Sequence, residues 1–205
     1  MARQGHTTFE KPHVLVVEGL DDFHVVVGVL AAMQIDSVHI VWTDGVENLG
    51  SRLKVYAKTP GWANVRRLGI LVDSDNDPAA RLDSIRSALG NAQLPVPRLA
   101  GDIVGDGLSV LYSTLPAPDA VGRLETVIAS AVPDAARVCI DQFMSCAGVA
   151  DDGVSGRHEK TFVHAYIAAT AEPGAKIGEA ITAGVLDVSG PAFEPIRVVL
   201  RALVT

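Results

Sequence analysis

The sequence predicts an α/β fold with a Rossmann-like core, in which a mainly parallel sheet is flanked by helices, and a helical C-terminal part. Three observations support this prediction. Short β-branched runs alternate with segments of helical periodicity as far as residue 89, the alternation stops after residue 90, and 48% of the 205 residues are apolar. Alternating strands and helices are typical of right-handed βαβ units, which build parallel sheets.

The expected strands of the first half are short aliphatic runs, and the expected helices carry apolar residues three or four positions apart. In chain order these patterns predict a strand at 13–17, a helix at 22–33, a strand at 37–42, a helix at 49–58, a strand at 68–72 and a helix at 78–89. Pro78 suits the first turn of the last helix, because an N–H at that position would have no partner in the helix.

After residue 90 the periodicity becomes mainly helical. A Pro-rich turn leads to an extended segment at 108–114, and the segments that follow predict helices at 121–131, 133–147, 156–171, 177–183 and 193–203. The aperiodic stretch 148–157 predicts an exposed loop. We expect one domain over residues 1–205, with an α/β core at 1–115 and a mainly helical extension or insert at 116–205.

Composition and charge exclude several classes of protein. No apolar tract reaches the roughly 18 residues of a membrane span, and the N-terminus lacks the apolar core of a signal peptide, so we expect a cytoplasmic protein without a membrane partner. The formal charge of −7 argues against a broadly basic surface that coats nucleic acid. Cys139 and Cys146 have no usual zinc spacing and are expected to be reduced core residues.

Acidic residues follow two of the expected strands. Glu18 comes directly after four aliphatic residues, and Asp73 ends the third expected strand, with Asp75 two positions later. The carboxyl ends of parallel strands meet at one edge of a sheet, so these carboxylates should lie close together and repel one another. Oxygen ligands without cysteine suit Mg²⁺, which would remove the conflict.

A purely structural explanation is open for each aspartate. Asp21 or Asp22 could cap the helix that follows the first strand, and Asp75 or Asp77 could cap the helix that follows the third. Glu18 does not fit this explanation, because glutamate is a poor cap.

Other motifs explain the acidic residues less well. An EF-hand loop counted from Asp73 requires Gly at its sixth position, where this chain has Pro78. Haloacid dehalogenase-type phosphotransferases place Asp-x-Asp on their first strand, whereas here it follows the third. Residues 18–23 do not supply the G-x-G-x-x-G of a dinucleotide site.

The three strand-following loops carry a set of residues that occurs together in a known family. EGLDD (18–22) follows the first strand, DG (44–45) the second and DSD (73–75) the third. This set resembles the TOPRIM domain shared by topoisomerases, primases and OLD-family nucleases. The spacing is most similar to OLD nucleases and to small stand-alone TOPRIM-like proteins, and it implies a TOPRIM core within the Rossmann-like fold.

The resemblance continues through GRLETVI (122–128) and HEKTFVHAYIAA (158–169). In OLD-type nucleases a Leu-Glu pair that opens a helix supplies a further metal ligand, and a lysine before a later helix assists catalysis. The matching positions are Glu125 and Lys160. Without the resemblance, the helix dipole alone explains an acid at Glu125, and Lys160 is an ordinary exposed lysine.

The resemblance therefore implies a site for one or two Mg²⁺ or Mn²⁺ ions. Two such ions would bind the attacking and leaving oxygens of a phosphoryl-transfer reaction. Glu18 and Lys160 are the expected catalytic residues. The expected metal ligands are Glu18, Asp22, Asp73, Asp75 and Glu125.

Our leading hypothesis is a divalent-metal-dependent nuclease or phosphoryl-transfer module that acts on nucleic acid, with DNA preferred over RNA. Five basic residues and no acid lie between residues 48 and 72, and of these Arg52, Lys54 and Lys58 are the expected nucleic-acid contacts. The alternative is a TOPRIM-like binding or regulatory protein with little or no catalysis. A phosphatase or a primase-type transferase is a third possibility. A protein partner or a homo-oligomer is compatible with each hypothesis.

Overall fold

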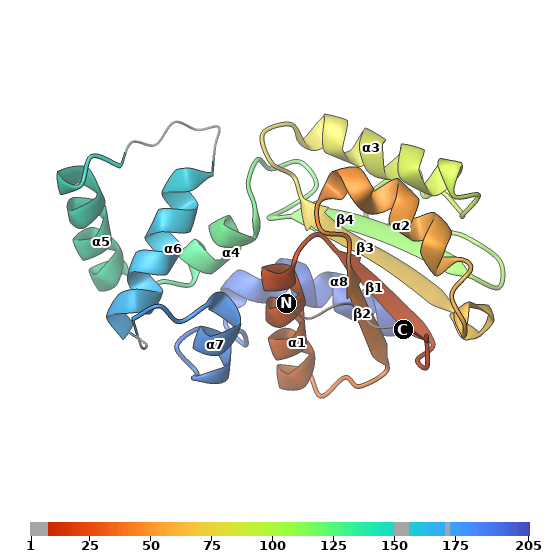
Figure 1. The fold of residues 1–205 in the computed structure, drawn as a ribbon, viewed down its shortest axis with the longest axis horizontal. Helices are drawn as coiled ribbons and strands as arrows, with labels where there is room; N and C mark the ends of the chain where they lie inside the picture. The colour runs from red at the N-terminus through yellow and green to blue at the C-terminus, as the bar shows by residue number, and fades with distance from the viewer. Residues whose placement is uncertain (1–7, 150–155, 171–172) are drawn as a thin grey trace.

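A four-stranded, all-parallel sheet forms the centre of the fold in the computed structural model, which describes residues 8–149, 156–170 and 173–205. The strand order is β2-β1-β3-β4 (Figure 1). The strands are β1 (His13–Val17), β2 (Val38–Trp42), β3 (Arg67–Asp73) and β4 (Ser109–Leu115). The α/β fold class predicted from the alternating pattern is confirmed.

Helices cover both faces of the sheet. On one face lie α2 (Leu49–Tyr56) and α3 (Pro78–Asn91), and on the other lie α1 (Leu20–Ala32) and α8 (Glu194–Val204) (Figure 1). Alternate residues of each strand point to opposite faces, so the sheet contributes to two separate apolar clusters. Continuous aliphatic runs such as β1 are therefore needed, because both of their faces are buried.

The connections create a switch point between β1 and β3. The chain passes from β1 through α1 to β2 on one side of β1, and from β2 through α2 to β3 on the other side. In open α/β sheets a ligand crevice lies beyond the carboxyl ends of the strands where the direction of winding reverses. Val17 at the end of β1 pairs with Leu71, so Glu18 and Asp73 both lie just beyond this pair.

The segments after β4 are helical, as predicted. They comprise α4 (Leu124–Ser130), α5 (Asp134–Cys146), α6 (Arg157–Thr170) and α7 (Ile177–Thr182), with α8 completing the series. Helices α4, α5 and α6 share a small apolar cluster of their own, and α7 packs on α1. Single turns of 3-10 helix occur at Val46–Asn48, Trp62–Asn64 and Pro191–Phe193.

Helix α8 returns the chain to the sheet. Its buried residues Ile196, Val199, Leu200 and Leu203 recur at helical spacing and face the strands. Gly69 in β3 allows a close approach, because a Cβ at this position would lie 3.2 Å from Leu203 Cδ1. The last described helix is thus part of the same core as the strands.

Three expectations from the sequence have different outcomes. Cys139 and Cys146 are exposed on α5, so their predicted place in the core is wrong. The predicted loop at 148–157 falls mostly on residues 150–155, which lie outside the described residues. None of the helices in the described ranges has both the length and the apolar character of a membrane span.

Candidate functional site

Three acidic side chains meet at the switch point between β1 and β3. Glu18 follows β1 directly, Asp22 lies in the first turn of α1, and Asp73 is the last residue of β3. The pocket around them has a volume of about 280 Å³. Its lining is formed by Glu18, Gly19, Leu20, Asp21, Asp22, Asp44, Gly45, Asp73, Leu124, Glu125 and Lys160.

Asp22 is buried in the turn that begins α1. Its Oδ2 accepts a hydrogen bond of 3.0 Å from the Gly19 backbone N–H, which satisfies a donor at the start of the helix. A Cβ at Gly19 would lie 3.3 Å from this oxygen, so glycine leaves the carboxylate room. The other oxygen, Oδ1, is buried and has no hydrogen-bond partner among the described residues.

Asp73 connects the sheet to the helical part. Its Oδ1 accepts a hydrogen bond of 2.9 Å from the backbone N–H of Leu124, the first residue of α4. Because Glu125 is the next residue, this bond also positions Glu125, whose side chain is only 12% exposed, at the same pocket.

Lys160 provides a positive charge at the rim of the pocket. Its Nζ lies 3.7 Å from Oε1 of Glu125, and 58% of its side chain is exposed. Glu125 comes from α4 and Lys160 from α6, so both helices contribute to the pocket that the strand ends begin. The predicted positions 18, 22, 73, 125 and 160 are thus brought together.

The acidic cluster makes deprotonation of its members unfavourable. Burial, followed by the nearby Glu18 carboxylate, raises the pKa of Asp22 to about 7. Burial, followed by Asp22, Glu18 and Glu125, raises the pKa of Asp73 to about 9. Burial also raises the pKa of Glu18, against the opposing effect of Arg81. A cation in this pocket would stabilise the charged forms and reverse these shifts.

The chemistry of the cluster fits a hard cation held by few protein ligands. Oε2 of Glu18 and Oδ1 of Asp22 are buried acceptors without a hydrogen-bond partner in the described part of the chain. No group of three or more His, Cys, Asp or Glu side chains in that part is arranged so that it could hold a metal ion. Mg²⁺ is commonly bound through one or two carboxylates and completes its shell with water and substrate phosphates. The residues therefore fit an open magnesium site but not a closed cage.

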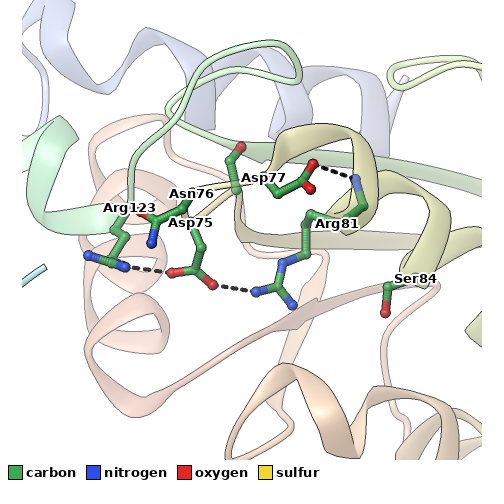
Figure 2. A pocket seen from close by; sticks show the side chains of 8 residues that line it. Asp75, Asn76, Asp77, Arg81, Ser84 and Arg123 are labelled. Carbon is green, nitrogen blue, oxygen red and sulfur yellow. Dashed lines mark hydrogen bonds and ion pairs between the residues drawn. The ribbon is translucent and has the colours of Figure 1, made fainter. Parts of the chain in front are cut away.

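Asp75 does not join this cluster, contrary to the metal-ligand role expected for it. Its carboxylate forms ion pairs with Arg81 and Arg123, the latter at 2.7 Å between Nε and Oδ1 (Figure 2). An extended strand would direct residues 73 and 75 to the same side, but β3 ends at Asp73 and Asp75 adopts a φ of 52°. Hydrogen bonds with Gly122 in both directions hold this left-handed turn.

Asp77 has the structural role proposed as an alternative. It is the N-cap of α3, and its side chain accepts a hydrogen bond of 2.9 Å from the Ala80 backbone N–H. The acidic residues of the third loop thus divide into three roles: Asp73 in the cluster, Asp75 with the arginines and Asp77 at the helix end.

Comparison with known proteins identifies the family. The family model described as "Protein of unknown function (DUF3226)" matches residues 12–205. The chain belongs to the DUF3226 family. The match includes all the strands and helices in the described part of the chain, so the acidic cluster lies within the DUF3226 region.

Among solved structures, this DUF3226 chain is similar to the C-terminal region of the OLD protein of Xanthomonas campestris pv. campestris. The sequence identity is 15%, the alignment covers 95% of each chain, and the TM-score is 0.47. Similarity at this level says nothing about activity. None of the curated proteins compared with the chain matches it.

The basic strip expected to contact nucleic acid lies on α2 and just after it. Arg52 forms an ion pair of 3.0 Å with Asp44, whereas Lys54 and Lys58 are exposed. Asp44 also lines the acidic pocket, so Arg52 lies beside that pocket. The predicted role of these three residues in binding remains a prediction.

Two arginines near the site were not predicted from the sequence. Arg81 lies in the first turns of α3, and Arg123 precedes α4. The two are 42 positions apart in the sequence, and the pairing of Asp75 with Gly122 and the ion pairs with Asp75 bring them together. No local pattern in the sequence pointed to these two arginines, because their contact with Asp75 joins segments far apart in the chain.

Proposed function

We propose that this chain is a divalent-metal-dependent phosphodiesterase that acts on nucleic acid, with a TOPRIM-like site formed by Glu18, Asp22 and Asp73. One observation carries the proposal: buried carboxylate oxygens of Glu18 and Asp22 lack partners in the described residues, at the switch point where open α/β sheets bind ligands. Uncompensated buried acceptors are costly, and a bound cation would compensate them.

Of the Glu18, Asp22 and Asp73 carboxylates, one or two would hold the metal directly and the rest would hold it through its waters, with Glu125 beside them. A Mg²⁺ or Mn²⁺ ion in such a site activates water and neutralises charge on a phosphoryl group. The side chains that do not bind metal have separate tasks. Lys160, exposed at the rim, would contact the phosphate oxygens and balance the negative charge of Glu125 and the substrate. Lys54 on α2 and Lys58 just after it would attract the nucleic-acid backbone.

A nicking assay tests the proposal. Supercoiled plasmid, linear duplex, single-stranded DNA and RNA are incubated with the protein in Mg²⁺, in Mn²⁺ and in EDTA. We expect metal-dependent cleavage of at least one substrate, with DNA preferred, and loss of cleavage in Asp73→Asn. Asp141→Asn is the matched control, since Asp141 is exposed on α5 and lines neither the acidic pocket nor its neighbours. Cleavage that survives in EDTA or in Asp73→Asn would exclude this site as its source.

A binding or regulatory protein is the second candidate. Two observations favour it: Arg52 is already paired with Asp44, and no closed metal site exists in the described residues. Thermal stabilisation by Mn²⁺ without cleavage of any of the four substrates would support this function over catalysis.

A further inference from the structure

A second polar pocket lies on the α3 side of the acidic cluster. Its volume is about 500 Å³, and Figure 2 shows its side chains from close by. The lining residues are Ser74, Asp75, Asn76, Asp77, Ala80, Arg81, Ser84 and Arg123. None of these residues lines the acidic pocket. The two pockets are nevertheless neighbours, because residues 73 and 124 line the acidic pocket and the adjacent residues 74 and 123 line this one.

The Asp75 carboxylate bridges two guanidinium groups inside this pocket. Arg123 Nε lies 2.7 Å from Oδ1 of Asp75, and an Arg81 terminal nitrogen is paired with Oδ2 (Figure 2). The arginine side chains are only 13% and 15% exposed, so both charges are held in place and largely removed from solvent. A planar anion with oxygens on both sides is therefore already bound by the pair.

Asp75 leaves part of this donor set unused. The Nε of Arg81 is buried and has no hydrogen-bond partner among the described residues. A guanidinium group offers five N–H donors in a fixed arrangement that matches the oxygens of carboxylate and phosphate. Each guanidinium group is paired with a different oxygen of Asp75. Together the two groups can accommodate an anion that has more oxygens than the Asp75 carboxylate.

We infer that Arg81 and Arg123 form a binding site for a phosphate group, and that the Asp75 carboxylate occupies it when no phosphate is bound. Phosphate presents up to four oxygens and pairs with arginine through charge-assisted hydrogen bonds. Once Asp75 withdraws, two positive charges face the ligand. Asp77, the other acid in the pocket, is engaged by the Ala80 backbone N–H, and Ser84 adds a hydroxyl to the lining.

This site adjoins the acidic cluster. After burial, the largest influences on the pKa of Glu18 are Arg81, which lowers it, and Asp75, which raises it. A nucleic-acid strand with one phosphate at the cluster would therefore place a neighbouring phosphate at the arginines. This assignment of the phosphate to nucleic acid rests on the proposed function, whereas phosphate binding itself does not require metal.

Titration calorimetry in EDTA tests the inference without any catalytic step. The ligands are inorganic phosphate, a 5′-phosphorylated trinucleotide and the same trinucleotide with a 5′-hydroxyl. We expect Arg81→Gln and Arg123→Gln each to weaken phosphate binding by about tenfold or more, because each removes a charged donor. Arg86→Gln is the matched control, since Arg86 lies on α3, pairs with Asp83 and lies outside the pocket.

Asp75→Asn separates this inference from simple damage to the fold. Replacing the competing carboxylate with a neutral amide should tighten phosphate binding several-fold, which an unfolded protein cannot do. An Asp75→Asn protein that binds phosphate no tighter than the wild type overturns the inference, and so do arginine variants that bind as the wild type does. Tighter binding of the 5′-phosphorylated strand identifies a strand end as the ligand, and equal binding of both strands identifies an internal phosphodiester.

Failure of the proposed function has a different signature. If the protein shows these phosphate affinities but no metal-dependent cleavage, the arginine site is supported and the phosphodiesterase proposal is wrong. Cleavage that depends on Asp73, combined with phosphate binding that is unchanged in Arg81→Gln, would support the phosphodiesterase proposal and overturn the arginine site.

Discussion

The Asp73 carboxylate accepts a hydrogen bond of 2.9 Å from the backbone N–H of Leu124, a residue 51 positions later in the chain. This bond ties the end of β3 to the start of α4 and places Glu125 beside the strand ends. Asp73 therefore has two roles that can be tested apart. It fixes the backbone of the helical part, and it contributes charge to the acidic pocket.

Asp73→Asn should keep the first role and lose the second. Asparagine retains an Oδ1 that can accept from Leu124, and it removes a charge that the neighbouring carboxylates oppose. In differential scanning fluorimetry at pH 8 with EDTA, we expect a Tm equal to or above that of the wild type. The rise in Tm that Mn²⁺ produces in the wild type should disappear. The Asp141→Asn control should keep that rise. An Asp73→Asn protein that is still stabilised by Mn²⁺ would contradict the assignment.

The stability of the metal-free protein should fall as pH rises. The folded-state pKa values of Asp22 and Asp73 are raised to about 7 and about 9, so the folded chain binds protons more tightly than the unfolded chain. The stability from these groups is complete below the unfolded value of 3.8 and is lost as pH rises through about 7 and then about 9.

Urea unfolding at a series of pH values between about 4 and 9 measures this dependence. In EDTA the free energy of unfolding should decrease across the range, and Mg²⁺ or Mn²⁺ should flatten the curve by stabilising the deprotonated forms. Asp73→Asn should flatten it without metal. A metal-free curve that rises toward pH 9 would show that the cluster does not control the pH dependence.

Lys160→Gln should affect activity far more than stability. The side chain is mostly exposed and its ion pair with Glu125 is long, so we expect a change in unfolding free energy within about 0.5 kcal/mol. If Lys160 stabilises charge on the phosphate, kcat should fall by about 100-fold. Lys176→Gln, an exposed lysine outside the acidic pocket, is the control. Equal losses in both variants would remove Lys160 from the catalytic role.

Gly19→Ala should weaken metal binding, because the new Cβ would press on the Asp22 carboxylate at 3.3 Å. Alanine is also a poorer N-cap than glycine, which lowers stability.

Gly90→Ala provides the opposite case: Gly90 lies within α3, and a Cβ there meets no atom within 4 Å. We expect it to stabilise the protein by about 0.5–1 kcal/mol and to leave metal binding unchanged. Calorimetric titration with Mn²⁺ compares the two.

The elements were predictable because their causes are local. Aliphatic runs gave the strands, helical periodicity gave the helices, and β1 begins and ends where the pattern predicted. The meeting of Glu18 with Asp73 followed from the general behaviour of parallel strand ends. The strand order β2-β1-β3-β4 was not predicted, because right-handed βαβ crossovers leave open which strands are neighbours.

The partners of Asp75 were not predictable from local patterns. Spacing alone directs residues 73 and 75 to one side, whereas the positive φ at Asp75 and its pairing with Gly122 turn the carboxylate away. Both depend on a segment almost 50 positions later in the chain. The exposure of Cys139 had a similar cause, because the periodicity of α5 does not reveal how little of that helix other elements cover.

The position of α8 constrains how the chain can fold during synthesis. All four strands precede α8 in the sequence, and one face of the sheet is completed only when this helix packs on β1, β3 and β4. While residues 194–204 are still inside the ribosome, the part of that face that α8 covers is exposed to solvent or to a chaperone. The core on this face is therefore completed later in synthesis than the core that α2 and α3 form with the strands on the other face.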